Sequence, residues 1–284
     1  MICEEVIFLK KLLLSCCLLS VLLVGCHKRP AAQTIKTGTL RATTFALVSS
    51  AENSTTDYTK QYAYIEDIGD GRGYTGGIIG FTSGTGDMLA VVQKYVALKP
   101  KHNPLQSYLS ALKKVNGTAS HQGLGPVFVR AWQRASKDEQ FIRAQDDILN
   151  QQYMNVALKL AKKDHLGPLG QYIYYDALVV HGPGADAKSF QGMRQKAFTK
   201  AKTPAQGGNQ ARYLNAFLAV RIPVMKSEAA HQDLSRIRTQ QQFLRAKNFN
   251  LALPLTWHMY GTEYHLTKRE VSTLIKKTKQ SRAN

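Results

Sequence analysis

The chain has 284 residues, of which 44% are hydrophobic and 20% are charged. This balance is that of an ordinary folded protein, so it excludes a largely disordered or fibrous chain. The 38 lysines and arginines against 19 acidic residues give a net charge of +19, which favours anionic partners for the surface as a whole.

The first 25 residues are predicted to be a lipoprotein-type signal peptide. Lys10 and Lys11 precede an apolar run from Leu12 to Val24, which is too short to span a bilayer as a stable helix. The run ends in Leu-Val-Gly-Cys at Cys26, which resembles the bacterial lipoprotein box, where the cysteine becomes the lipidated first residue. A lipid anchor on Cys26 would hold the protein at a membrane facing out of the cytoplasm. The alternative is a plain secretory signal and an extracellular protein.

All the cysteines of the chain lie in this leader or at its end. They are Cys3, Cys16, Cys17 and Cys26. The folded part therefore has no disulfide and no thiol that could serve as a nucleophile or a metal ligand.

Residues 26–38 are polar, lack periodicity and contain a proline, so they are predicted to form a flexible tether. In the next stretch, from Leu40 to Glu52, the apolar residues fall on one arc of a helical wheel, as in a helix that faces a core. Residues 62–81 combine short apolar pieces with a glycine-dense turn, which predicts a small β-hairpin sheet.

The rest of the domain, which we place at residues 39–267, is predicted to be mostly helical. Helical periodicity covers about residues 87–98, 104–115, 138–162, 167–181, 209–229 and 239–247. Residues 268–284 are basic and have few apolar residues, so they are predicted to be a frayed tail.

Charge is unevenly distributed along this domain. Residues 51–90 hold six carboxylates and two cations, a net charge of −4, so the remainder of the chain carries +23. A polycationic ligand would be repelled by most of the surface but attracted to this segment.

Glu52 and Asp70 are candidates for acid and base catalysis within the acidic segment. Glu52 falls on the apolar arc of its helix, where loss of hydration would favour the protonated form that a general acid needs. The alternative is that Glu52 lies past the helix end in water. Asp70 lies among glycines in Ile68–Gly73, where a sharp turn would leave an ionised carboxylate exposed. Its alternative is an ordinary Asp-Gly turn residue.

The acidic segment carries a recognisable pattern. It consists of Glu52-Asn53, Tyr62, Asp70-Gly71-Arg72-Gly73-Tyr74-Thr75, Ile79-Gly80 and Asp87. This pattern resembles the signature of bacterial chitosanases of glycoside hydrolase family 46. The likeness continues over roughly residues 45–265, through ALKKVNGTASHQGLG, YYDALVVHGPG, KAKTPAQGG and SEAAHQDLSRIRTQQ.

The resemblance implies a mainly α, two-lobed, lysozyme-like fold with a small β-sheet in the N-terminal lobe and a cleft between the lobes. It implies endo-hydrolysis of chitosan with inversion at the anomeric carbon and no metal or cofactor. Glu52 would protonate the leaving oxygen, Asp70 would activate water and Thr75 would hold that water. The substrate-binding positions would be Tyr64, Arg72, Asp87, His181 and Glu228.

The sequence also predicts a charged group behind the acid. Asp176 and Arg221 each lie on an apolar line of a predicted helix, so we expect them to form an ion pair. The resemblance adds Arg236 and implies a network behind Glu52, although Pro223 would kink the helix of Arg221 and make its direction less certain. For Asp176 and Arg221 a purely stabilising role is the better interpretation.

Two alternatives to a chitosanase remain open. One is a peptidoglycan-cleaving hydrolase, which a lysozyme-like fold in the cell envelope permits. The other is a polysaccharide-binding or nucleic-acid-binding protein without catalysis, which the basic balance permits. A protein that only binds has no need for the pair of Glu52 and Asp70, so we expect an enzyme. We also expect it to be a monomer and to bind polysaccharide and a membrane, but not nucleic acid. Trp132 and Trp257 are predicted to pack in the core rather than to stack on sugars.

Overall fold

The computed structural model describes residues 33–227 and 232–281 of the chain. The predicted leader, Cys26 and Glu228 lie outside the described residues. The described residues from Gln33 onward belong to one compact unit. No helix in residues 33–227 and 232–281 has the length and apolarity needed to cross a membrane.

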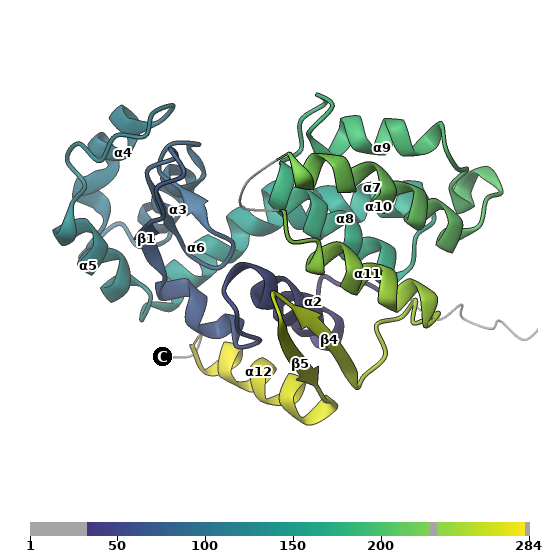
Figure 1. The fold of residues 1–284 in the computed structure, drawn as a ribbon. Coiled ribbons are helices and arrows are strands. Elements are labelled where there is room, and N and C mark those ends of the chain that lie inside the picture. The colour runs from purple at the N-terminus through teal and green to yellow at the C-terminus, as the bar shows by residue number, and fades with distance from the viewer. Residues whose placement is uncertain (1–32, 228–231, 282–284) are drawn as a thin grey trace, which may run out of the picture. The chain divides into compact units, whose positions relative to one another are not determined.

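Helices dominate this unit, as predicted (Figure 1). The N-terminal part contains α2 (Gly38–Glu52), η1 (Tyr58–Ala63), β1 (Ile65–Asp67), β2 (Tyr74–Gly76), β3 (Phe81–Thr82), α3 (Asp87–Leu98), η2 (Gln106–Tyr108), α4 (Leu109–Val115), α5 (Pro126–Ala135) and α6 (Glu139–Leu149). A π-helical turn, η3 (Asn150–Met154), joins α6 to α7 (Asn155–Lys163). Then follow α8 (Pro168–His181), α9 (Phe190–Phe198), η4 (Pro204–Gln206), α10 (Gln210–Lys226), α11 (Ser235–Arg245), β4 (Leu255–Met259), β5 (Thr262–Leu266) and α12 (Lys268–Ser281).

The elements form two lobes within the unit. The first sheet, α3, α4 and α5 lie in one lobe, and helices α7 to α11 lie in the other, while α6 runs from the first toward the second (Figure 1). The first sheet is antiparallel in the order β1-β2-β3, and β4 pairs with β5 in a separate hairpin. The predicted mainly α, two-lobed arrangement with a small sheet is confirmed.

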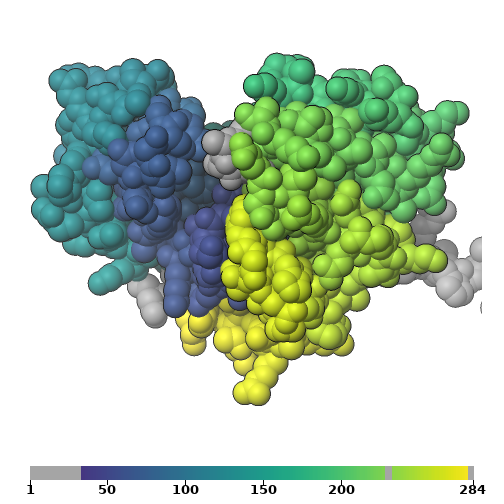
Figure 2. Space-filling model, viewed as in Figure 1, coloured from purple at the N-terminus to yellow at the C-terminus, as the bar shows by residue number. Residues whose placement is uncertain are grey.

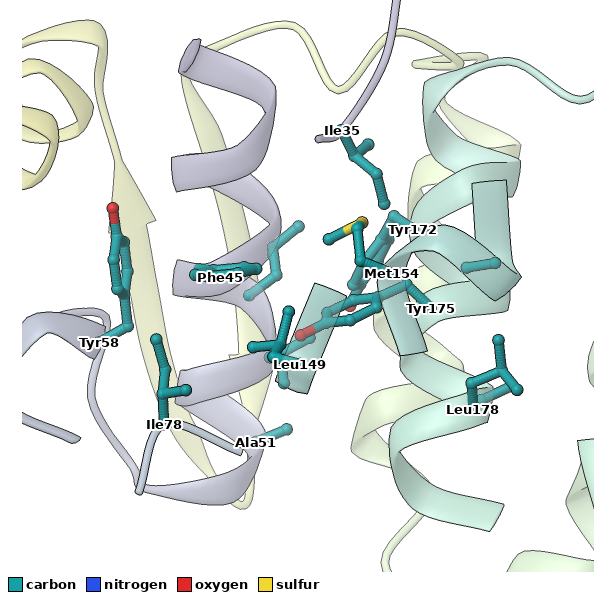
Figure 3. Close-up of a cluster of buried hydrophobic side chains, with 14 of the residues drawn as sticks. Ile35, Phe45, Ala51, Tyr58, Ile78, Leu149, Met154, Tyr172, Tyr175 and Leu178 are labelled. Carbon is teal, nitrogen blue, oxygen red and sulfur yellow. The ribbon is translucent and has the colours of Figure 1, made fainter. Parts of the chain in front are cut away.

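Helix α2 lies at the centre of the hydrophobic core. All residues from Ala42 to Ala51 are buried, so the helix is covered on every side rather than along one arc. Phe45 stacks on Tyr175 of α8 with ring centroids 6.0 Å apart and meets Tyr58 edge-on at 5.3 Å (Figure 3). Aromatic pairs of these geometries add to the apolar burial that fixes α2, and they set the position of Glu52 at its end.

The glycine-dense turn predicted from the sequence supports the first sheet. Gly73 has φ 72°, a conformation that other residues rarely adopt, and a side chain there would collide with Ser83. The hydroxyl of Ser83 instead accepts a hydrogen bond from the backbone N–H of Tyr74 at 3.0 Å. The close approach fixes β2 in register, with Thr75 opposite Glu66 on β1 and Thr82 on β3.

The C-terminal segment differs from the prediction of a frayed tail. Residues Lys268–Ser281 form α12, whose Val271 and Leu274 are buried against the rest of the unit. Lys277 also pairs with Asp57 at 2.7 Å. The prediction was wrong because three apolar residues at helical spacing, the third being Ile275, are enough to bury one side of an otherwise basic helix.

Candidate active site

A groove of about 610 Å³ lies between the C-terminal end of α2, the first sheet, η3 and the end of α8. Figure 2 shows the surface hollowed between the part of the chain that contains the first sheet and the green part that contains α8 to α11. The groove is lined by Glu52, Asn53, Tyr64, Ile68, Arg72, Thr75, Ile79, Gly80, Thr82, Thr85, Gly86, Asp87, Gln152, Tyr153, Val179, Val180, Gly182 and Pro183. The structure therefore brings five of the predicted site residues to one cavity.

Glu52 is the last residue of α2 and lies at the groove wall. Its side chain is 32% exposed, and its carboxylate accepts a hydrogen bond from Nη2 of Arg236. The expectation that Glu52 is dehydrated on an apolar face is wrong. Because α2 ends at this residue, the side chain leaves the buried surface and meets both solvent and a guanidinium.

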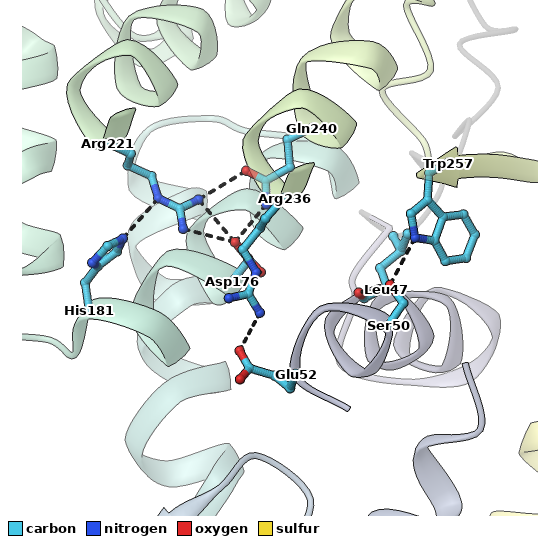
Figure 4. Close-up of polar contacts among 9 residues, drawn as sticks. All are labelled: Leu47, Ser50, Glu52, Asp176, His181, Arg221, Arg236, Gln240 and Trp257. Atoms are coloured by element: carbon cyan, nitrogen blue, oxygen red, sulfur yellow. Dashed lines mark hydrogen bonds and ion pairs between the residues drawn. The ribbon is translucent and has the colours of Figure 1, made fainter. Parts of the chain in front are cut away.

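Behind Glu52 lies a buried charge network, drawn in Figure 4. Asp176 accepts from Nη1 and Nη2 of Arg221, both at 3.1 Å, and lies 3.0 Å from Nε of Arg236. Gln240 donates to the same carboxylate at 2.8 Å and accepts from Arg221 at 3.1 Å. The expected pairing of Asp176 with Arg221 is therefore present, and Arg236 links it to Glu52.

The side chains of Asp176, Arg221 and Arg236 are at most 1% exposed. Burial lowers the pKa of Arg221 despite the neighbouring Asp176. Burial also acts to lower the pKa of Arg236, but the charges of Asp176 and Glu52 outweigh it, so this pKa lies well above its usual value. With Glu52 ionised the network holds two positive and two negative charges, so Arg236 is a fixed cation aimed at Glu52.

The helix of Arg221 is less disturbed by Pro223 than predicted. Helix α10 continues past Pro223 to Lys226, and the guanidinium of Arg221 reaches Asp176. A proline removes one backbone donor, and here the loss falls in the last turns of the helix, where a break affects little of the chain.

Asp70 lies in the turn between β1 and β2 and is not among the residues that line the groove. Its Oδ2 accepts from Nε of Arg72 at 2.8 Å and from Nη2 at 2.5 Å, and its Oδ1 accepts from the Arg72 backbone N–H at 3.0 Å. Arg72 does line the groove, so Asp70 lies at its edge. Partial burial acts to raise the pKa of Asp70, but the hydrogen bonds from Arg72 outweigh it, so the pKa lies below its usual value.

Thr75 lies on the central strand β2 and is one of the residues that line the groove. The residue is 7% exposed, and its hydroxyl has no hydrogen-bond partner among the described residues. A buried hydroxyl without a partner carries a desolvation cost that a bound water or substrate atom would remove.

Asp87 begins α3 next to β3 and lines the groove. Its Oδ1 accepts from the backbone N–H of Thr82 at 2.7 Å, from the Thr85 hydroxyl at 2.9 Å and from the Met88 N–H at 2.9 Å. Its Oδ2 lies 3.5 Å from the hydroxyl of Tyr153. Burial raises the pKa of Asp87, although these hydrogen bonds act in the opposite direction.

Gln152 and Tyr153 are among the groove residues that the sequence did not predict. Both belong to the π-helical turn η3, inside a stretch predicted as continuous α-helix. A π turn shifts the following side chains around the helix axis and is frequent at functional sites, but it leaves no pattern in the residue types.

The remaining predicted residues differ in placement. Tyr64 lines the groove and donates to Glu66 at 3.2 Å. His181 ends α8 and lies 3.4 Å from Nε of Arg221, so it contacts the charge network and is not among the lining residues of the groove. Trp132 and Trp257 are fully buried, as predicted for core residues. Across residues 33–227 and 232–281, no three histidine or carboxylate side chains cluster in a way that could hold a metal ion.

Comparisons with known proteins show the family of the chain. The sequence profile of Glycosyl hydrolase family 46 matches residues 46–255. A chitosanase of Streptomyces sp. strain N174 is 58% identical over 219 residues, which cover 77% of this chain and 78% of that protein.

Solved structures give the same result. A co-crystal structure of chitosanase OU01 with substrate is similar with a TM-score of 0.81 at 49% identity, covering 83% of this chain and 100% of that one. A family 46 chitosanase of Gynuella sunshinyii in complex with chitotetraose gives 0.75 at 31% identity, covering 81% of this chain and 98% of that one.

Proposed function

The chain belongs to glycosyl hydrolase family 46 and is a glycoside hydrolase, and from this premise we propose that it cleaves β-1,4 linkages between glucosamine residues of chitosan, within the polymer and with inversion. The observation that carries the proposal is the groove wall itself. Glu52, Arg72, Thr75 and Asp87 all line the groove, and Asp70 is bonded to Arg72 at its edge.

Glu52 is proposed as the general acid. It gives its proton to the leaving glycosidic oxygen and becomes a carboxylate, which the fixed charge of Arg236 stabilises at the moment it forms. Asp176 holds Arg236 in place and is itself held by Arg221, so the part of this pair in the reaction is positioning.

Asp70 is proposed as the general base that activates a water on the opposite face of the sugar. A carboxylate has about four acceptor sites. Arg72 occupies two sites on Oδ2 and one on Oδ1, which leaves a site on Oδ1 for the water proton. The hydroxyl of Thr75, which has no partner among the described residues, supports holding that water in line.

Asp87 is proposed to accept a hydrogen bond from a substrate ammonium group. Three donors fix its Oδ1, while its Oδ2 is contacted by Tyr153 from the groove side, so the carboxylate is oriented before substrate arrives. The acidic segment around it, with net charge −4, attracts a polycation that the rest of the protein would repel.

Product analysis tests the proposal. The protein should release reducing ends from chitosan and not from peptidoglycan, and proton NMR of fresh products should show the α-anomer first. Initial β-anomer would contradict inversion, and activity on peptidoglycan alone would favour the runner-up hydrolase. Binding of either polymer without new reducing ends would favour a non-catalytic protein.

Export as a lipoprotein anchored through Cys26 is a separate proposal, tested by metabolic labelling with a fatty acid in the wild type and in Cys26→Ala.

A further inference from the structure

The face of the unit formed by α12 and the start of α2 carries cations that have no acidic partner within residues 33–227 and 232–281. On α12, Lys268, Arg269, Lys276 and Lys279 are exposed and have no acidic partner among the described residues. Lys36, just before α2, is exposed in the same way. We call these five residues the basic face.

The acidic groups near this face are already engaged. Glu270 accepts from the N–H and the hydroxyl of Thr267, at 2.6 and 2.8 Å, where it caps the start of α12. Asp57 is paired with Lys277 at 2.7 Å. The positive charge of the basic face is therefore available to an outside partner.

A depression of about 510 Å³ joins the two parts of this face. Lys36 and Lys279 both line it, together with apolar and aromatic side chains that include Phe45, Tyr58 and Ile275. The cations at its rim fit a partner whose surface is anionic. That chemistry is the chemistry of an anionic phospholipid layer.

The basic face and the groove lie at opposite ends of one helix. The depression is lined by Gly38, Arg41 and Ala42 in the first turns of α2, and the groove by Glu52 at its end. A helix of 15 residues is about 22 Å long. In Figures 1 and 2, α12 occupies the lower edge of the unit, away from α4 and α9.

We propose that the basic face docks on an anionic phospholipid surface and holds the groove away from it, open to polymer. The start of the unit favours a membrane over a nucleic acid, because Gln33, three residues before Lys36, follows Cys26 by seven residues, which when extended reach about 25 Å from the proposed lipid anchor. The aromatic side chains of the depression are part of the buried core, so the stacking surface that a single-stranded nucleic acid needs is missing from this face. The inference goes beyond the hydrolase activity and does not depend on it.

The test uses residues 27–284, because the compact unit starts at Gln33 and the predicted leader would bind membranes by itself. Sedimentation measures binding to vesicles of phosphatidylcholine alone and of phosphatidylcholine with phosphatidylglycerol. We expect binding to the anionic vesicles that high salt abolishes, and little binding to the neutral ones.

A matched pair of variants separates the face from net charge. The face variant changes four cations of α12 to Gln, namely Lys268, Arg269, Lys276 and Lys279. The control changes four exposed lysines of α4 and α7 to Gln, namely Lys113, Lys114, Lys162 and Lys163. Each cation near an anionic surface contributes roughly fivefold, so the face variant should bind about a hundredfold or more weakly. The control should bind within about threefold of the wild type.

Three results would overturn the inference. They are absence of binding to anionic vesicles, equal weakening by both variants, and retention of the face variant on vesicles at wild-type strength. Retention on immobilised heparin measures binding of the same proteins to an acidic polymer. A wild type that binds heparin through the basic face but ignores the vesicles would assign the face to an acidic polymer and refute the membrane. Circular dichroism and thermal unfolding of all three proteins verify that the variants are folded.

Discussion

The guanidinium of Arg72 holds the carboxylate of Asp70 at the groove edge, with Nε 2.8 Å from Oδ2. This pair decides in which pH range Asp70 can serve as a base. Since the hydrogen bonds from Arg72 lower the pKa of Asp70 against the opposing effect of partial burial, Asp70 stays ionised to lower pH than a free aspartate.

Replacing Arg72 with Ala should therefore move the acidic limb of the kcat/KM profile to higher pH. Without the guanidinium the pKa of Asp70 rises, so the base is lost earlier as the pH falls. Arg143→Ala, which removes an exposed arginine paired with Asp147 on α6, is the control and should leave the profile unchanged. An acidic limb that stays in place in Arg72→Ala would show that Asp70 is not the titrating group.

Glu52→Gln keeps the shape of the side chain and removes the transferable proton. We expect kcat on chitosan to fall by about 10²- to 10⁴-fold, the range of general acid catalysis, with little change in chitosan binding. Glu66→Gln makes the same change on β1 outside the groove lining and should keep most of the activity. Comparable losses in the two variants would mean that the negative charge of the segment matters, and not a proton donated by Glu52.

Thr75→Val removes a hydroxyl and keeps the volume of the side chain. If that hydroxyl holds the attacking water, kcat should fall at least about tenfold while KM stays near the wild-type value. Thr75→Ser restores the hydroxyl and should recover most of the rate. Full activity in Thr75→Val would leave the buried hydroxyl without a part in the reaction.

Asp87→Asn tests ammonium recognition. Loss of the charge should raise KM for chitosan by roughly tenfold, since charge-assisted hydrogen bonds are about twice as strong as neutral ones. Burial raises the pKa of Asp87, so its charge is lost at a higher pH than that of a free aspartate as the solution is acidified. In the wild type KM should therefore rise on acidification, and in Asp87→Asn this rise should be absent.

The buried network contributes to both stability and activity. Asp176→Asn leaves Arg221 and Arg236 without their shared carboxylate and should lower the free energy of unfolding by about 3–5 kcal/mol in denaturant titrations. Asp164→Asn is the matched control, because Asp164 holds the buried Arg194 at 2.6 Å in a separate pair outside the groove. Both variants should lose stability, but only Asp176→Asn should lower the kcat of the protein that remains folded, through misplaced Arg236.

Much of the fold could be predicted from local pattern. The limits of α3 and α8 follow from apolar periodicity and from glycines and prolines near their ends, and the glycine-dense turn correctly indicated the first sheet. Helices α5 and α9 and the hairpin of β4 and β5 were not predicted. The local pattern of α12 predicts a frayed tail, because its three apolar residues stabilise a helix only against the rest of the unit.

The site could be assembled from sequence only through the family resemblance. Nothing in the pattern around Glu52 indicates that Arg236, 184 residues later, is its charged partner, and only the resemblance implied it. The apolar arc alone led to the wrong expectation that Glu52 is dehydrated. The pairing of Asp176 with Arg221 could be predicted, because a charge on the apolar side of a helix must be paired when it is buried. The contribution of Tyr153 depends on a π turn that residue types do not reveal.

The support of α2 comes from the far end of the chain. The indole of Trp257 donates to the hydroxyl of Ser50 across 207 residues, and α12 packs against the same helix. A protein emerges from the ribosome with its N-terminus first. Helix α2 is therefore fully packed only after the C-terminal segments have been synthesised. Contacts between residues so far apart in the sequence slow folding. A chain still in synthesis would lack these contacts, so the groove wall at the end of α2 would be complete only after the segment of α12 has been made.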